Sequence, residues 1–272
     1  MKVIDMHAHI YPDKVAAKAS VAITDYFALS APPCHYGSVG ELVAVMERAG
    51  LDYAMVCSAA TTPHQVESIN RFIAAQCREN PAFIPCGTLH ADYENYRAEL
   101  AWLRENGIHG VKIVCEFQHF ALDDERLFPM FEEMEKHDMF LFAHMGDPRV
   151  NLSGPHRMLP VATTFPKLRC IAAHLGNWDD WDIGKIRPLA GLSNVYTDIS
   201  SSFGYVATAQ EREHLKAVMD EYDPTHVFFG SDYPVWCPEK EVARAVALGF
   251  DREQLEDILF NNFARFYHYR EL

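Results

Sequence analysis

Two histidines stand two residues apart near the start of the chain, in the apolar run IDMHAHI. Side chains at positions i and i+2 of a strand project to the same side, so His7 and His9 can direct their ring nitrogens to one point. Imidazole nitrogen is a common zinc ligand, at about 2.0–2.1 Å from the ion. The pair therefore indicates a metal site.

Three further polar residues end other apolar segments: His144 closes MFLFAH, His174 closes LRCIAAH, and Asp232 closes HVFFGSD. Taken singly, either histidine reads as a core residue that donates to a backbone carbonyl. Five such placements together favour a shared site of three imidazoles and a carboxylate. Such a site suits Zn²⁺, with Mn²⁺, Fe²⁺ or Co²⁺ as alternatives. We expect one divalent metal ion with a position left for water.

These residues lie in a repeating pattern of strands and helices. Eight short apolar runs are expected to be strands: 3–10, 53–58, 83–88, 110–115, 139–144, 168–174, 194–199 and 226–232. Helical periodicity fills most of the intervals, as in 41–49, 65–79, 93–105, 125–137 and 211–222. Apolar strands separated by helices are typical of a parallel sheet covered on both faces.

We predict an α/β fold, a (β/α)₈ TIM barrel that forms a single domain over residues 1–272. An open doubly wound sheet is the alternative, but no GxGxxG turn follows the first strand. In a barrel the carboxyl ends of the strands form the catalytic face, so the five polar residues would converge there.

The segment from Tyr11 to Gly37 is too long for a plain loop between a strand and a helix, and it contains Pro12, Pro32 and Pro33. We expect a flap insertion over one end of the barrel, with a short helix of its own. A surface insertion packed on the outer helices is the alternative. Aromatic residues near the C-terminus are expected to seal the barrel rather than to form a dimer: Phe260, Phe263, Phe266, Tyr267 and Tyr269.

The composition of the chain argues against nucleic acid and membranes as binding partners. The formal net charge is -14, from 38 acidic and 24 basic residues, and this charge would repel nucleic acid. No apolar run approaches the roughly 20 residues needed to span a bilayer, and no signal peptide is evident. The seven cysteines form no CxxC pair and read as reduced thiols. We expect a cytoplasmic protein with a small-molecule substrate and no membrane partner; a homo-oligomer is left open.

The HxH pair, LFAHMGD, IAAHLGN, NVYTDIS, FFGSDYP and the C-terminal ILFNNFARFY together resemble the amidohydrolase-related barrel proteins. More narrowly, they resemble the branch that includes aminocarboxymuconate-semialdehyde decarboxylase and many predicted metal-dependent hydrolases. The resemblance spans nearly the whole chain. It implies His7, His9, His144 and Asp232 as metal ligands. It also implies that His174 and Asp232 move protons, with the division between them open.

Lys112, in GVKIVCEF, lies on the expected fourth strand. Many superfamily members carry a carboxylated lysine there that bridges two metals, which would support a second ion. In the resembled branch the site is usually mononuclear, so the resemblance favours Lys112 as a cation for a substrate carboxylate or as a partner of Asp198.

Residues after the strands would contact the substrate. Lys112, His119 and Arg149 are the expected cations, and Trp236 is an expected aromatic contact; an ordinary loop role is the alternative for each. The leading hypothesis is a metal-dependent hydrolase of the amidohydrolase superfamily that acts on a small carboxylated or cyclic metabolite. The first alternative is a metal-dependent non-oxidative decarboxylase, a carbon-carbon lyase, of an unsaturated or aromatic acid. The second is a non-catalytic ligand-binding barrel.

Overall fold

The computed structural model describes residues 1–147, 149–178, 180–203 and 206–272. Its strands form one eight-stranded parallel sheet in chain order. They are β1 (Ile4–His9), β2 (Tyr53–Cys57), β3 (Phe83–Thr88), β4 (Gly110–Ile113), β5 (Phe140–Ala143), β6 (Arg169–Ala172), β7 (Val195–Asp198) and β8 (Val227–Phe228). Every predicted strand is present, and the predicted TIM barrel is confirmed.

The last strand is shorter than predicted because the chain beyond Phe228 turns from β7 toward β1. The Met6 N–H donates to the Phe229 carbonyl at 3.0 Å, and Ala8 forms a parallel bridge with Tyr233. These contacts bring the two edges of the sheet together. A side chain at Gly230 would meet the Cβ of His7 at 2.8 Å, so this close approach requires glycine.

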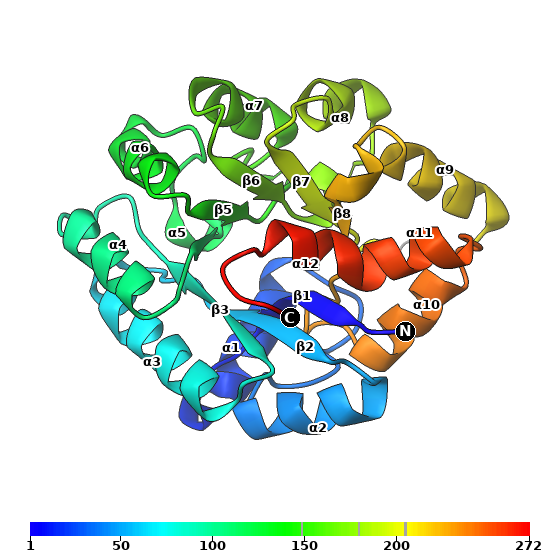
Figure 1. Ribbon diagram of the computed structural model, residues 1–272, viewed down its shortest axis with the longest axis horizontal. Coiled ribbons are helices and arrows are strands. Elements are labelled where there is room, and N and C mark those ends of the chain that lie inside the picture. Colours follow the sequence, from blue (N-terminus) through cyan, green and yellow to red (C-terminus); the bar gives the residue numbers. More distant parts are fainter. Residues whose placement is uncertain (148, 179, 204–205) are drawn as a thin grey trace.

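Helices surround the barrel (Figure 1). They are α1 (Asp13–Tyr26), α2 (Val39–Ala49), α3 (Val66–Glu79), α4 (Tyr96–Glu105), α5 (Cys115–Gln118), α6 (Phe128–Lys136), α7 (Pro155–Thr164), α8 (Ile183–Ala190), α9 (Ala209–Met219), α10 (Pro238–Val246), α11 (Arg252–Glu256) and α12 (Asn262–Phe266). Short 3₁₀ turns are η1 (Pro63–Gln65), η2 (Glu125–Leu127), η3 (His174–Gly176) and η5 (Pro224–His226), and the π-helical turn η6 (Asp257–Asn261) joins α11 to α12. No helix of the described residues has the length and apolar character needed to cross a bilayer.

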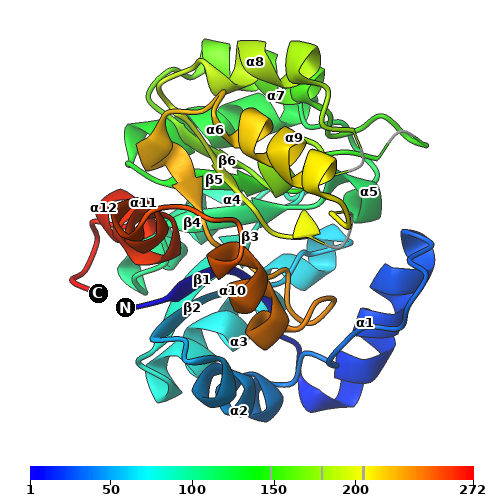
Figure 2. The same cartoon turned by 90° about the vertical axis from the view of Figure 1, so that its right-hand side faces the viewer.

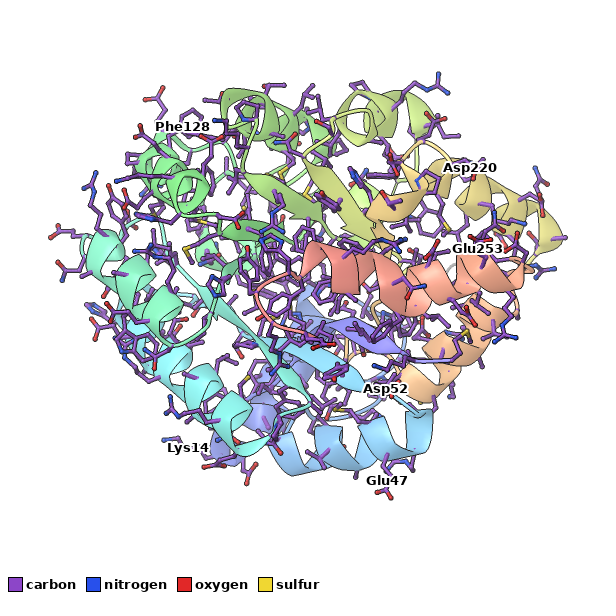
Figure 3. All side chains as sticks on the ribbon, viewed as in Figure 1. Lys14, Glu47, Asp52, Phe128, Asp220 and Glu253 are labelled. Carbon is purple, nitrogen blue, oxygen red and sulfur yellow. The ribbon has the colours of Figure 1, made fainter. Side chains whose placement is uncertain are left out.

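The barrel interior is filled by side chains rather than open (Figure 3). Phe140 and Phe228 pack with Phe263 and Phe266 of the C-terminal segment, and Phe142 belongs to the same buried cluster. Helices α11 and α12 lie across the amino end of the barrel, whereas α1 and α5 lie at the opposite end (Figure 2). The C-terminal aromatics therefore seal the base of the barrel, as predicted.

A β-bulge in β1 sets the direction of the paired histidines. The register with β2 shifts between Asp5 and Ala8. Met6 packs in the barrel interior, and the next residue, His7, also faces inward against the Phe142 ring at 4.6 Å. Regular alternation would send these neighbours to opposite faces. Beyond the bulge the side chains alternate again, and His9 points inward like His7. One strand therefore supplies a packing residue, Met6, and two residues of the candidate site.

Candidate metal centre

Ligand atoms from opposite ends of the chain converge at the carboxyl end of the barrel. His7 Nε2 lies 3.2 Å from His9 Nε2. Asp232 Oδ1 lies 3.4 Å from His7 Nε2 and 3.5 Å from His9 Nε2. Atoms held about 2.0–2.1 Å from a tetrahedral zinc ion are themselves about 3.3–3.4 Å apart. The three atoms therefore fit a divalent ion that keeps a further position open.

Hydrogen bonds behind the rings direct their lone pairs to this point. His7 Nδ1 donates to Asp198 Oδ2 at 3.0 Å, which leaves Nε2 without a proton. Asp198 is fully buried, and its Oδ1 accepts from the backbone N–H groups of Ser200 (2.9 Å) and His174 (3.1 Å). A carboxylate behind a histidine in this way fixes the tautomer that binds metal. The sequence reading named Asp198 only as a partner for Lys112, so this role was missed.

Asp232 is oriented by its neighbours in the same manner. Its Oδ2 accepts a hydrogen bond from Ser201 Oγ at 2.7 Å, and Trp236 Nε1 donates to that hydroxyl at 2.9 Å. Oδ1 is thereby left to face the two imidazoles. Trp236 was predicted as a substrate contact; it borders the cavity at this site and also supports Asp232 through Ser201.

His144 and His174 form a second pair beside the first. The His174 ring stacks on His7 with centroids 5.1 Å apart, and its Nε2 lies 3.0 Å from His144 Nδ1. The opposite nitrogens face backbone carbonyls, of Ser200 at 3.2 Å and of Gly146 at 3.0 Å. A hydrogen bond between the two rings requires a proton on one of the two facing nitrogens, His144 Nδ1 or His174 Nε2. His144 lies beside His174 and is not part of the group formed by His7, His9 and Asp232.

Lys112 reaches the same point from β4. It is fully buried, its Nζ lies 3.2 Å from His7 Nε2, and it stands 3.5 Å above the Phe142 ring centroid. Burial lowers the pKa of this ammonium. The same His7 nitrogen serves either as an acceptor for Lys112 or as a metal ligand.

Burial and neighbouring charges set the protonation states of the candidate ligands. Burial, with the Lys112 ammonium nearby, lowers the pKa of His7 to about 3, so its ring is neutral. Burial opposes ionisation of Asp232, yet the neighbouring imidazoles hold the pKa of this carboxyl well below its ordinary value. Burial also opposes protonation of His9, but Cys57 and Asp232 raise its pKa to about 9. Metals bind neutral imidazole and ionised carboxylate, so His7 and Asp232 are in the form that binds a metal. A metal ion would have to displace the proton on His9.

Three residues of the site hold left-handed backbone conformations. The φ angles of His174, Ser201 and Asp232 are 59°, 56° and 60°. Such conformations cost roughly 1–3 kcal/mol each in residues other than glycine, and they gather at functional sites. The left-handed turns change the chain direction directly after β6, β7 and β8, where the site residues are needed.

Asp5 is another residue that sequence reasoning missed. Its carboxylate is fully buried and accepts from the backbone N–H groups of His7 (3.1 Å) and Ser231 (2.9 Å). It therefore ties the bulge of β1 to the segment that carries Asp232. The signal was available in the sequence, because an acidic residue inside an apolar strand requires a partner.

The other two predicted cations have different placements. Arg149 forms two hydrogen bonds with the Asp147 carboxylate, at 2.8 and 2.7 Å, and donates to the Tyr26 carbonyl at 2.5 Å. His119 is exposed and ends α5 with φ 61°. Neither residue lines the cavity at the metal centre in the part of the chain that is described. Of the three, only Lys112 does so.

A cavity of about 540 Å³ opens from the candidate metal centre. His9, His144, His174 and Asp232 line it, and α1 forms part of its wall. The segment from Tyr11 to Gly37 is thus a flap beside the catalytic face, as the first of the two interpretations predicted. This volume is in the range of pockets that hold small molecules.

Asp198→Asn is expected to weaken divalent-ion binding by about 10- to 100-fold. The amide oxygen of asparagine can still accept the hydrogen bonds from the two backbone N–H groups, but its NH₂ group then donates to His7 Nδ1. His7 would carry its proton on Nε2, the nitrogen that faces the metal position. Competition with a metal-binding dye measures the affinity. Asp182→Asn is the control, because Asp182 caps α8 and accepts from the Gly184 N–H at 2.8 Å. Equal affinities in the two variants would contradict this role of Asp198.

Glu116 is expected to make the stability depend on pH. Burial raises its pKa to about 7 from an ordinary 4.5, although Ser153 donates to its carboxylate. The folded chain keeps this proton where the unfolded chain has lost it, so its contribution to stability falls as the pH rises from about 4.5 to 7. Glu116→Gln should raise the free energy of unfolding by about 3 kcal/mol at pH 8 and change it little at pH 4. Urea unfolding measures both values; an equal gain at both pH values would contradict this assignment, and the exposed Glu125→Gln is the control.

A parallel barrel with this donor set at the carboxyl ends of its strands has the architecture of a TIM-barrel metalloenzyme. Residues 4–269 match the model of the amidohydrolase family. The chain belongs to that family and is an enzyme of the metal-dependent amidohydrolase superfamily. Membership of this enzyme family argues against the alternative of a non-catalytic ligand-binding barrel.

Solved structures share the fold over the whole chain. An uncharacterised TIM-barrel protein of Bordetella bronchiseptica is 18% identical with a TM-score of 0.79, covering 99% of both chains. A probable 2-pyrone-4,6-dicarboxylic acid hydrolase of Acinetobacter baumannii is 14% identical with a TM-score of 0.73, over 98% of this chain and 100% of that one. The 5-carboxyvanillate decarboxylase of Sphingomonas paucimobilis is 16% identical with a TM-score of 0.71, over 98% and 99%. At these identities the likeness concerns the fold.

Proposed function

We propose that this chain is a metal-dependent hydrolase that cleaves a C–O or C–N bond of a small carbonyl compound. The observation that carries the proposal is the triangle of His7 Nε2, His9 Nε2 and Asp232 Oδ1, with sides of 3.2–3.5 Å. His9 and Asp232 line the cavity. A divalent ion held there, most simply one Zn²⁺, would lower the pKa of a water toward about 7. The family resemblance implies His144 as a further ligand, but in the structure its ring nitrogens face His174 and the Gly146 carbonyl, outside this group of three.

Asp232 is the proposed proton acceptor. Ser201 holds Oδ2, so Oδ1 is the oxygen turned toward the reacting water. The water oxygen forms a bond to the substrate carbonyl carbon while its proton passes to Asp232. The bond to the leaving oxygen or nitrogen then breaks, and that atom receives the proton.

Lys112 and His174 are proposed to act on the substrate. When His7 Nε2 serves as a ligand, the Lys112 ammonium loses that acceptor and can donate to the substrate carbonyl oxygen. His174 donates from Nδ1 to the Ser200 carbonyl at 3.2 Å, which leaves Nε2 to accept or return a proton beside the cavity. Both groups are buried, so water competes little for these hydrogen bonds.

Non-oxidative decarboxylation is the second candidate. Lys112 favours it, because a buried ammonium beside the ligand set can hold a substrate carboxylate. The bond from that carboxylate to carbon would break and carbon dioxide would leave. The electron pair left on the carbon would take a proton that His174 Nε2 relays from solvent. A similar fold occurs in the decarboxylase named above.

A product assay tests the proposal. Lactones, esters and amides would be screened for acid release, and unsaturated or ring-substituted carboxylic acids for carbon dioxide, with zinc-loaded and manganese-loaded protein. The proposal expects acid release that a chelator abolishes and added metal restores. Carbon dioxide release alone, or acid release that survives complete metal removal, would contradict it.

A further inference from the structure

The cavity at the candidate site has two chemically different ends. Its inner end is polar and includes Lys112, His174 and Asp232. Its outer part is walled by apolar side chains of three helices: Val15, Ala19 and Ile23 of α1, Ile69 and Phe72 of α3, and Phe117 of α5. The polar residues beside the α3 wall hydrogen-bond to one another: Thr61 Oγ1 donates to Gln65 Oε1 at 2.9 Å, and Ser68 Oγ donates to the Gln65 carbonyl at 3.0 Å. A substrate that fills this space therefore meets the ionised groups only at the inner end.

One face of α1 lines the cavity. Val15, Ala19 and Ile23 are spaced by four residues, so they lie along one side of the helix. A neighbouring side attaches the helix to the molecule, where Ala16 and Ser20 are buried and Ser20 Oγ donates to the Tyr36 carbonyl at 2.5 Å. The cavity face is therefore separate from the face that holds α1 in place.

The residue that follows α1, Phe27, contacts residues of the candidate site. The Phe27 ring contacts His144 with centroids 5.1 Å apart and Trp178 at 5.5 Å. Arg149, held by Asp147, donates to the Tyr26 carbonyl at 2.5 Å. These contacts fix the distance between the apolar face of α1 and the polar inner end.

Charge is nearly absent from the outer part of the cavity. Besides histidines, the charged residues that line the cavity within the described ranges are Lys14, Lys112 and Asp232. Lys112 and Asp232 belong to the inner end, and Lys14 is exposed at the start of α1, where it projects at the edge of the molecule (Figure 3). A second ionised group on the substrate would find no buried partner along the apolar walls.

We propose that the substrate carries a single polar reactive group and an extended apolar arm, alkyl or aryl, which lies between α1 and α3. The inference rests on the proposed function for the reactive group, an acyl group cleaved at the metal centre. The arm subsite itself rests on the lining residues. Burial of each methylene in this subsite strengthens binding about threefold to fourfold.

Straight-chain carboxylic acids from acetate to octanoate test the arm without requiring turnover. Isothermal titration calorimetry on the zinc-loaded protein measures their affinities, and the methyl esters of the same acids measure hydrolysis. Ala19→Trp fills the subsite, and Ile23→Ser makes it polar. Val21→Trp is the matched control, because Val21 lies on the same helix, is 40% exposed and is absent from the lining.

The expected result is an affinity that rises about threefold to fourfold with each methylene in the wild type and in Val21→Trp, but stays flat in Ala19→Trp and Ile23→Ser. A flat series in the wild type, or an unchanged slope in both subsite variants, would overturn the arm subsite. Hydrolysis without any chain-length dependence would overturn it while leaving the proposed function intact. Chain-length-dependent binding without hydrolysis of any ester would retain the subsite and overturn the proposed function.

Discussion

Asp232→Asn is expected to lower kcat/KM by about 10²- to 10⁴-fold, the range that a positioned acid–base group supplies. The carboxylate stands within 3.5 Å of both His7 Nε2 and His9 Nε2 and is also the proposed proton acceptor. A neutral amide neither balances the charge of a divalent ion nor accepts a proton from water. Steady-state kinetics with the best substrate of the product assay, and metal content of the same samples, measure the effect.

The control for Asp232→Asn is Asp182→Asn, which changes a carboxylate that caps α8 through the Gly184 N–H. That variant should keep wild-type kinetics and metal content. Circular dichroism of both variants separates loss of the fold from loss of the site. Wild-type kcat/KM in folded Asp232→Asn would contradict the proposed role.

Phe263→Ala is expected to lower the free energy of unfolding by about 3–5 kcal/mol. Phe263 is almost fully buried and packs on Phe228 and Phe266 in the base of the barrel, with centroids 5.4 and 5.8 Å away. Its removal leaves a cavity that rigid strands on one side and α12 on the other cannot close. Urea unfolding measures the change.

Phe260→Ala is the matched control for this substitution. Phe260 is only partly buried, and Lys2 Nζ lies over its ring at 4.8 Å, so a loss of about 1 kcal/mol is expected. Both variants should bind metal as the wild type does, because the base lies at the opposite end of the barrel from the ligands. Equal destabilisation by the two variants would contradict the interpretation of Phe263 as part of the seal.

Much of the fold was readable from local sequence. The eight strands are short apolar runs, and helices such as α2 carry their own boundaries: Ser38 Oγ accepts from the Glu41 N–H at 3.3 Å, and Gly50 ends the helix with φ 67°. Helices α7 and α8 were harder to define from periodicity, since Pro160 and Pro188 lie inside them. The end of β8 was predicted too late because the turn toward β1 depends on partners 220 residues away along the chain.

The sequence predicted the candidate ligand residues, but it did not predict the residues that orient them through hydrogen bonds. Histidines and an aspartate at strand ends predict convergence, because a parallel barrel brings those ends together. Asp5 and Asp198 act through hydrogen bonds to His7, and neither partner lies at a fixed spacing in the sequence. Arg149 illustrates the opposite case, since its type and position suit anion binding but its guanidinium is committed to Asp147.

Metal stoichiometry tests the central claim most directly. Protein stripped with a chelator would be dialysed against zinc, then analysed for metal and titrated by calorimetry, alongside His9→Ala and the exposed His64→Ala. We predict one divalent ion per chain in the wild type and in His64→Ala, and loss of that ion in His9→Ala. A wild type that holds no ion, or a folded His9→Ala that holds it as tightly, would contradict the claim.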